Sequence, residues 1–337
     1  MIDFKIGILG AGHIAGKIAE TIAKLDGFQV AAIASRDKKR AEDFAAKYEI
    51  EKAYGDYDEL LADPEIELVY IATFHPTHAN LAIRTLEAGK PVLVEKPISY
   101  NAKTAETVMG IAREKKLFCG EALWTRFMPM TLHLRELIAA KAIGDVRFVH
   151  ATLGYKLIEK ERLLRPEAAG GALLDLGIYP LSMIFMVMGS LPAACASSVN
   201  RLSSNVDAIE TINMNFPQGQ MASAFVSMLY ELDNRAIIYG TRGRIEVEGV
   251  NLPTRIRVYG ENGEILEETT PPEKQTTGYE YEFLAARNAI IMGRVECNEL
   301  THVESRDMLR FMDTLRKTWK ISFPLPEEPA PEETEKK

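Results

Sequence analysis

Cysteine is scarce in this sequence, with only three residues among 337. Cys119, Cys195 and Cys297 lie far apart and follow no metal-binding spacing. A disulfide framework and a cysteine-ligated metal centre are therefore excluded, and we expect no metal site. Free thiols are typical of a reducing compartment, and no signal-peptide pattern opens the chain. We therefore expect a cytoplasmic protein.

The sequence also lacks an excess of positive charge. Its 40 Lys and Arg residues are outnumbered by 48 Asp and Glu residues, so the formal net charge is −8. The basic residues are scattered apart from a short cluster at residues 36–40, so neither nucleic acid nor an anionic membrane surface is an expected partner.

A long uninterrupted hydrophobic run is missing as well. Residues 176–200 carry no charge, but Pro180, Gly189 and Pro192 interrupt them. The densely apolar part is too short to cross about 30 Å of hydrocarbon. We expect a buried helix followed by a turn and a strand, and no membrane association.

The N-terminus contains a glycine motif between a strand pattern and a helix pattern. An apolar run of strand length ends in Gly-x-Gly-x-x-Ala, formed by Gly10, Gly12 and Ala15. Gly10 allows a tight turn, Gly12 lets the backbone approach phosphates, and Ala15 allows close packing of helix and strand. The N–H groups at the helix start attract an anion. The segment predicts a dinucleotide site that includes His13 and Ile14; the alternative is an ordinary Gly-rich turn.

Strand and helix patterns alternate over the first 120 residues or so. Strands are predicted at residues 4–9, 29–35, 68–73, 91–94 and 117–120, and helices at 37–48, 57–62, 76–88 and 102–115. Such alternation is typical of right-handed βαβ units around a parallel sheet. We predict an α/β Rossmann domain over residues 1–121.

The pattern changes after residue 121 to a series of strands joined by turns. Strands are predicted at 146–155, 194–202, 208–216, 220–229, 235–240, 243–247, 255–259 and 264–268, and helices at 127–140, around 180–188, at 279–292 and at 301–318. This predicts an α+β domain over residues 122–323 with a large, mostly antiparallel open sheet. Residues 324–337, rich in Pro and Glu, are expected to form a disordered acidic tail.

An open sheet needs something to cover its apolar face. Ile212, Met214 and Phe216 alternate along one predicted strand. We expect them to lie on an uncovered face that pairs two copies of the chain into a homodimer.

The end of the second predicted strand indicates which cofactor is bound. NAD enzymes place an acid there for the ribose, whereas this chain has Ser35 and Arg36. Arg36 can bind a 2′-phosphate through two hydrogen bonds, and Ser35 can donate another. We therefore expect NADP rather than NAD. The alternatives are a solvated helix start capped by Asp37, or Asp37 as a ribose ligand placed two residues late.

Two further motifs bear chemically active side chains. Lys96 follows a predicted strand, where ligands of such sheets bind, and Pro97 after it is a candidate cis-proline. Asp175 and Tyr179 are four residues apart and share a face if a helix runs from about residue 173 past Pro180. An acid and a phenol together can move a proton on a hydroxyl or carbonyl. The alternative is a half-buried tyrosine whose hydroxyl bonds to the aspartate.

These motifs together resemble the glucose–fructose oxidoreductase / inositol dehydrogenase (Gfo/Idh/MocA) family. The similar segments are residues 7–15, 71–78, 88–97 and 170–180, in the family's order along the chain. Residues 121–129 and the Asp-x-Gly-x-Tyr motif resemble the branch of dimeric dihydrodiol dehydrogenases and NADP-dependent D-xylose dehydrogenases. Tyr179 stands where inositol-type members carry His, which disfavours a cyclitol substrate.

The resemblance implies hydride transfer between NAD(P) and a carbinol carbon of a sugar or cyclic diol, in a dimer formed through the open sheet. It implies that Tyr179 is the acid/base, that Lys96 assists it and lowers its pKa, and that Asp175 orients the group. Trp124 and Arg126 would line the substrate pocket. Further cofactor contacts are expected from Thr73, His75, His78, Glu95 and Lys96.

Three alternatives stay open at this point. His78 could cap the start of the helix beside Pro76 instead of contacting the cofactor. The whole chain could be an NADP-binding regulator without turnover, although Lys96, Asp175 and Tyr179 are all present. A biliverdin-reductase-like enzyme would not need the Asp-x-Gly-x-Tyr motif.

Overall fold

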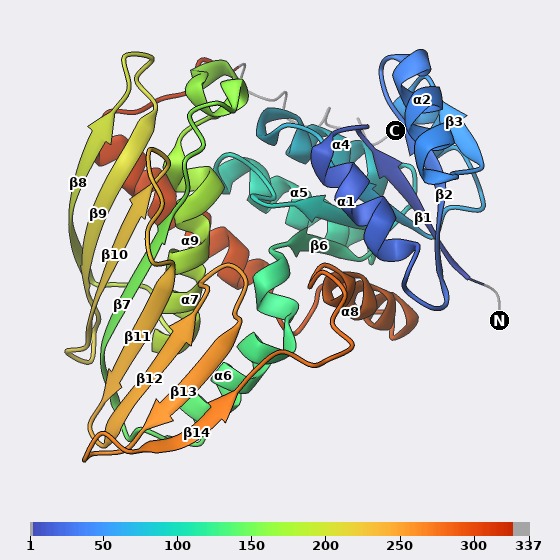
Figure 1. Ribbon diagram of the computed structural model, residues 1–337. Coiled ribbons are helices and arrows are strands. Elements are labelled where there is room, and N and C mark those ends of the chain that lie inside the picture. Colours follow the sequence, from blue (N-terminus) through green and yellow to red (C-terminus); the bar gives the residue numbers. More distant parts are fainter. Residues whose placement is uncertain (1–2, 326–337) are drawn as a thin grey trace.

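The computed structural model describes residues 3–325. It contains a six-stranded and an eight-stranded sheet, joined by helices that lie between them (Figure 1). The predicted fold class is confirmed. The predicted tail at 324–337 lies outside the described residues apart from its first two, and the predicted division after residue 121 stays a prediction.

The first sheet is parallel throughout, in the order β3-β2-β1-β4-β5-β6. Its strands are β1 (Phe4–Leu9), β2 (Phe28–Ala34), β3 (Lys52–Tyr54), β4 (Leu68–Ile71), β5 (Val92–Glu95) and β6 (Cys119–Ala122), and its helices are α1 (His13–Ile22), α2 (Lys38–Tyr48), α3 (Tyr57–Leu61), α4 (His75–Glu87) and α5 (Ala102–Lys115). Strand β3 was not predicted, because its three residues are only half-buried and form no apolar run. The order reverses between β1 and β4, which is where such sheets bind ligands.

The second sheet has the order β14-β13-β12-β11-β7-β10-β9-β8, and only β7 and β10 pair in parallel. Its strands are β7 (Val146–Gly154), β8 (Ala194–Arg201), β9 (Asp207–Asn215), β10 (Met221–Ser227), β11 (Arg235–Gly240), β12 (Gly243–Glu248), β13 (Arg255–Tyr259) and β14 (Ile265–Thr269). Helices α6 (Pro129–Ala139), α7 (Ile178–Met188) and α9 (His302–Thr318) lie on the side that faces the first sheet (Figure 1).

Helix α8 (Glu280–Ile291) returns from the second sheet to the first. Its Phe283 packs on Tyr70 of β4, with ring centroids 5.2 Å apart. His302, at the start of α9, bonds through Nε2 to the carbonyl of Cys119 at 2.8 Å. The C-terminal helices α8 and α9 therefore contact strands β4 and β6 of the first sheet.

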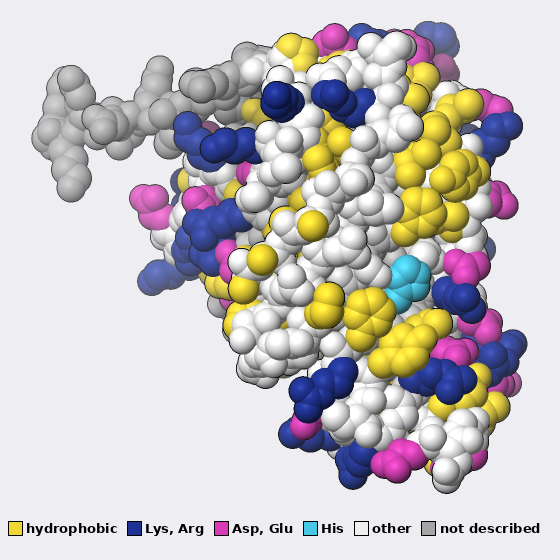
Figure 2. Space-filling model, turned by 90° about the vertical axis from the view of Figure 1, so that its left-hand side faces the viewer, with side chains coloured by type: hydrophobic (Ala, Val, Ile, Leu, Met, Phe, Trp, Pro, Cys, Tyr) yellow, Lys and Arg dark blue, Asp and Glu magenta, His cyan; other side chains and the backbone are white. Residues whose placement is uncertain are grey.

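One prediction about the second sheet is wrong. Ile212 and Met214 are fully buried and Phe216 is 4% exposed, because this side of β9 faces the helices. The opposite face carries other apolar side chains: Phe148, Met221, Phe225, Ile237 and Tyr239 occupy alternate positions on three adjacent strands. Figure 2 shows hydrophobic side chains gathered on this open face. The alternation of apolar residues along β9 was predicted correctly, but the face of the sheet that the helices cover was not.

The helical stretch Pro166–Met188 has the length and apolar composition of a membrane span, with a mean hydropathy of 1.7. However, 83% of that apolar segment is buried inside the protein. Burial of this extent is typical of a core helix.

Gly10 and Gly12 differ in whether the fold has room for a side chain at their position, and one substitution at each position tests this difference. Gly10 has φ +102°, and an added Cβ would lie 2.7 Å from the carbonyl oxygen of Ala72. The Cβ of Gly12→Ala would meet the same oxygen at 3.8 Å, an ordinary contact. We expect Gly10→Ala to lower the free energy of unfolding by about 1–3 kcal/mol and Gly12→Ala to leave it nearly unchanged. Urea denaturation of both variants tests this; equal losses would contradict it.

Candidate active site

A cavity of about 1950 Å³ opens at the carboxyl ends of the parallel strands and is lined by both parts of the chain. The first sheet contributes Gly10, Thr73 and Lys96, and the second part contributes Asp175 and Tyr179. Its volume exceeds the roughly 300–1,000 Å³ of ordinary ligand pockets. It can hold a dinucleotide and a small substrate together.

The dinucleotide end is formed by the loop between β1 and α1. Gly12 is the N-cap of α1, with no side chain capping the helix. His13 and Ile14 also line the cavity at this helix start. Uncapped N–H groups and the helix dipole provide a site for a pyrophosphate. These residues fit the dinucleotide that the glycine motif predicts.

Ser35 and Arg36 line the cavity at the end of β2, and their predicted contact with the cofactor stays a prediction. Asp37 is occupied as the N-cap of α2, where it accepts a hydrogen bond from the Arg40 N–H at 3.2 Å. Arg40, for which no role was predicted, has a defined contact here. Its guanidinium donates two hydrogen bonds, of 3.2 and 3.0 Å, to the carbonyl of Ala11 in the glycine loop. Arg40 therefore holds the start of α2 against the glycine loop.

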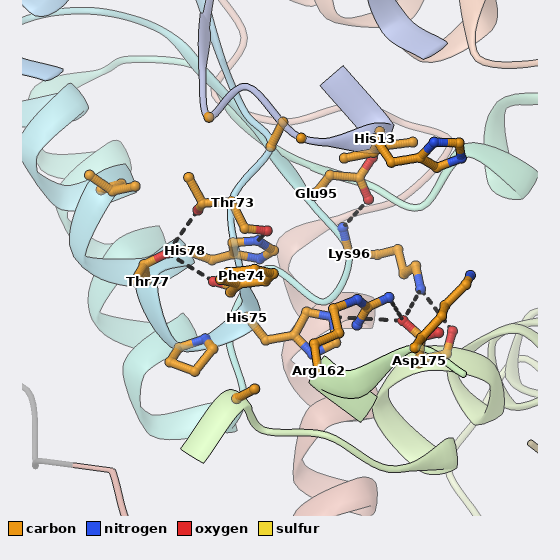
Figure 3. A pocket seen from close by; sticks show the side chains of 18 of the residues that line it. His13, Thr73, Phe74, His75, Thr77, His78, Glu95, Lys96, Arg162 and Asp175 are labelled. Carbon is orange, nitrogen blue, oxygen red and sulfur yellow. Dashed lines mark hydrogen bonds and ion pairs between the residues drawn. The ribbon is translucent and has the colours of Figure 1, made fainter. Parts of the chain in front are cut away.

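A buried aspartate joins the two halves of the cavity (Figure 3). The Lys96 ammonium donates to the Asp175 carbonyl at 2.7 Å and lies 3.4 Å from its carboxylate, which Arg162 contacts at 2.8 Å. Burial alone would raise the pKa of Asp175, but the charges of Lys96 and Arg162 outweigh it and hold that pKa well below its usual value. Arg162 comes from a short 3₁₀ helix, Glu161–Leu164, which no sequence pattern predicts.

His75 and His78, the two histidines that follow β4, line the cavity. Both are buried, and burial lowers the pKa of each, so both rings are neutral at pH 7. His75 contacts the carbonyl of Ala169 at 3.3 Å. The ring nitrogens of His78 lie 2.8 Å from the Pro97 carbonyl and 3.1 Å from the Thr73 carbonyl. His78 thus lies between two loops instead of capping a helix, and its neutral ring, with a single N–H, donates to one of these two carbonyls.

Glu95 belongs to a buried polar group beneath Lys96, whose peptide bond to Pro97 is cis. Its carboxylate accepts hydrogen bonds from the Tyr70 hydroxyl and from the Lys96 N–H. Burial raises the pKa of Glu95 to about 6 in spite of these bonds. Glu282 of α8 is also fully buried, and burial and the Glu95 charge raise its pKa well above the ordinary value. Tyr70 and Glu282 carried no motif that could have identified them.

Tyr179 lies at the junction of two helical geometries. Leu173–Gly177 forms a π-helical turn, and the α-helix begins at Ile178. Pro180 has no N–H to donate back into this turn, which favours the wider spacing. The Lys96 ammonium lies 5.1 Å from the centre of the Tyr179 ring, and Trp124 donates its indole N–H to the Tyr179 hydroxyl at 3.1 Å.

The expectation that Lys96 lowers the pKa of Tyr179 is wrong for this structure. Burial, together with the nearby Glu95 carboxyl, raises the pKa of Tyr179 well above its ordinary value. The Lys96 ammonium is directed to Asp175, so its charge does not reach the phenol oxygen through a hydrogen bond.

The remaining wall of the cavity contains aromatic and amide side chains. Trp124 and Tyr279 line it and stack with their ring centroids 4.2 Å apart. The Tyr155 hydroxyl donates to Asn251 at 2.9 Å. Arg126 is not brought to this cavity: its buried guanidinium contacts Ser182 at 3.3 Å and pairs with Glu304 at 2.5 Å.

Two family models match the chain. The model described as "Oxidoreductase family, NAD-binding Rossmann fold" matches residues 4–122, and "GFO/IDH/MocA C-terminal domain" matches residues 131–246. Among known proteins, trans-1,2-dihydrobenzene-1,2-diol dehydrogenase of Sus scrofa is 36% identical over 326 residues, covering 94% of this chain and 97% of its own. The human enzyme of the same name is 34% identical, with the same coverage.

Solved structures show the same fold. An aldose-aldose oxidoreductase of Caulobacter crescentus, complexed with glycerol, has a TM-score of 0.85 at 21% identity, covering 94% of this chain and 98% of its own. A 3-ketoreductase of Actinomadura kijaniata, in complex with NADP and TDP-benzene, has a TM-score of 0.82 at 23% identity, covering 94% and 97%. With both family models in order along one chain and relatives above 30% identity over nearly its whole length, this protein belongs to the Gfo/Idh/MocA family of NAD(P)-binding oxidoreductases.

Proposed function

We propose that this protein is an NADP-dependent dehydrogenase that moves a hydride between the nicotinamide and a carbinol carbon of a sugar or cyclic diol. The observation that supports it best is the convergence of Lys96, Asp175 and Tyr179 in one cavity beside the glycine loop. Relatives named as diol dehydrogenases and a structural neighbour that acts on aldoses support the substrate class.

Tyr179 is the proposed acid/base. In oxidation it takes the hydroxyl proton of the carbinol while the hydride leaves the same carbon; in reduction it returns the proton to the carbonyl oxygen. When bound, the nicotinamide supplies the hydride acceptor or donor. Burial keeps the phenol protonated, so the proton that Tyr179 gives to a carbonyl oxygen in reduction is present at neutral pH.

Lys96 and Asp175 set the charge beside the phenol. Asp175 holds the ammonium by its carbonyl and its carboxylate, so the positive charge stays near the reacting oxygen. Arg162 offsets the remaining carboxylate charge. Asp175 therefore orients the group instead of exchanging protons, since its pKa lies far below neutral pH.

The NADP preference rests on the basic cluster at the end of β2. Arg36 lines the cavity, Asp37 is engaged as a helix cap, and Arg40 is held on the glycine loop. Asp37, the acid that follows β2, is thus engaged as a helix cap and leaves the end of the strand to Ser35 and Arg36. The three cysteines are free thiols, which supports a reducing, cytoplasmic location.

The open face of the eight-stranded sheet is the proposed homodimer interface. Tyr239 is 41% exposed and Met221 50% exposed, and Phe148 contacts Tyr239 with ring centroids 6.1 Å apart. Such an exposed apolar patch is typical of an interaction site.

Arg36→Ala tests the cofactor assignment. A charge-assisted hydrogen bond to phosphate contributes about 1.5–3 kcal/mol, so the variant should raise the KM for NADP about tenfold or more and leave that for NAD nearly unchanged. Lys39→Ala is the control, because Lys39 pairs with Asp43 and does not line the cavity. Tighter binding of NAD than NADP by the wild type would overturn the assignment.

Tyr179→Phe tests the acid/base. Removing a general acid–base group should lower kcat by about 10²–10⁴-fold with little change in NADP affinity. Tyr281→Phe removes a hydroxyl from α8 outside the cavity and should keep wild-type turnover. Turnover assays on aldoses and cyclic diols give the comparison. If Tyr179→Phe kept half of the wild-type kcat, the proton would have to move through another group.

Tyr239→Glu tests the interface. A charge within the apolar patch should convert a dimer into a monomer at micromolar concentration, as measured by light scattering. Ile265→Glu on the edge strand β14 is the control, because Ile265 is also exposed, at 57%, but lies away from the patch. A monomeric wild type would rule the dimer out.

A further inference from the structure

The hydroxyl of Tyr179 forms a hydrogen bond with a residue other than Lys96. The indole N–H of Trp124 donates to it at 3.1 Å, and both residues are only 8% exposed. Among residues 3–325, no other side chain forms a hydrogen bond with this hydroxyl. An indole N–H can only donate, so the phenol oxygen accepts and its own proton is directed elsewhere.

The direction of this indole N–H is fixed by packing. The Trp124 ring stacks on Tyr279 with an interplanar angle of 12°. Gly278, at φ +95°, lies against the same ring, and a Cβ there would meet Trp124 Cζ3 at 3.2 Å. The short 3₁₀ helix Trp124–Phe127 holds the backbone of the tryptophan directly after β6. The ring therefore has little freedom to turn away from Tyr179.

We propose that Trp124 is a positioning residue for Tyr179, whose indole N–H directs the phenol proton into the cavity and stabilises the phenol oxygen when that proton leaves. The inference rests on the proposed function, since it concerns the residue that moves the proton there. It adds a role in the proton transfer to the substrate-lining role expected for Trp124.

The surrounding charges explain why a neutral donor matters here. Burial raises the pKa of Tyr179, Glu95 raises it further, and the indole hydrogen bond is a contact that lowers it. The ammonium of Lys96 is bonded to Asp175 and not to the phenol. The titratable and charged groups that face Tyr179 are Glu95 and Lys96 from β5 and its end, Asp175 from the π-helical turn, and Tyr279 and Glu282 from the start of α8.

Nuclear magnetic resonance of the indole groups tests the hydrogen bond without any substrate. The chain has two tryptophans, and the second, Trp319, donates to Ser197 at 2.9 Å. Tyr179→Phe should shift the Trp124 indole N–H resonance and leave that of Trp319 unchanged; the variant Trp319→Phe assigns the two signals. An unmoved Trp124 resonance would overturn the proposal and leave the proposed function intact.

Kinetics tests the consequence of the bond. In the Trp319→Phe background, replacing the remaining tryptophan with β-(3-benzothienyl)alanine keeps the ring shape and the stack but removes the N–H. We expect kcat to fall about tenfold, the basic limb of the pH–rate profile to rise by about one unit, and KM to stay within about threefold. Trp124→Phe should act in the same direction.

Two outcomes would contradict the positioning role. An unchanged kcat and pH profile would show that the N–H is unimportant, and a change confined to KM would show that Trp124 only packs against the substrate. Failure of the proposed function has a different signature, namely a wild type that turns over no aldose or diol with NADP. In that case the positioning role falls with the reaction, whatever the resonances show.

Discussion

The arrangement of the cavity depends on one buried carboxylate. Asp175 belongs to the second part of the chain, yet it accepts hydrogen bonds from Lys96, at the end of a strand of the first sheet, and from Arg162. Breaking a buried ion pair by removing one partner costs about 3–5 kcal/mol, because the remaining charge is left uncompensated. The same contact therefore holds the two parts of the chain together and fixes the position of the Lys96 ammonium.

The carboxylate in turn limits what the lysine can do. The ammonium directs its hydrogen bonds to Asp175 and lies 5.1 Å from the centre of the Tyr179 ring instead of bonding to the phenol oxygen. The phenol is buried beside Glu95 and stays protonated. On this account, Lys96 acts on Tyr179 through space, and the directional contact comes from Trp124. The phenol of Tyr179, the ammonium of Lys96 and the indole N–H of Trp124 come from three separate segments of the chain. These three groups therefore meet only when the chain has folded completely.

The parts of the site that could be predicted from sequence are those encoded locally. Gly10 and Gly12 sit between a strand and a helix, and Lys96 directly follows a strand, so the topology of a parallel sheet brings them to one edge. Resemblance to the family pointed to Asp175 and Tyr179. Arg162, Tyr70 and Glu282 could not be found in this way, because each meets the site through a contact distant in sequence and none belongs to a recognisable pattern.

The errors have a common physical cause. Alternation along β9 separates its two faces, but which face the helices cover depends on tertiary packing, and Ile212 and Met214 are on the covered one. Arg126 is close to Trp124 in sequence but turns toward Glu304 of α9. The pKa of Tyr179 depends on how fully it is buried and on the partner that Lys96 prefers, which no local pattern records.

Isotope transfer tests the central claim of direct hydride transfer in this cavity. The wild-type protein would be incubated with NADP and cyclic vicinal diols or aldoses that carry deuterium on the reacting carbinol carbon. The account predicts that deuterium appears at C4 of the nicotinamide, without dilution by solvent hydrogen. Reduced cofactor that contains no deuterium, or no reduced cofactor with any of these substrates, would contradict it.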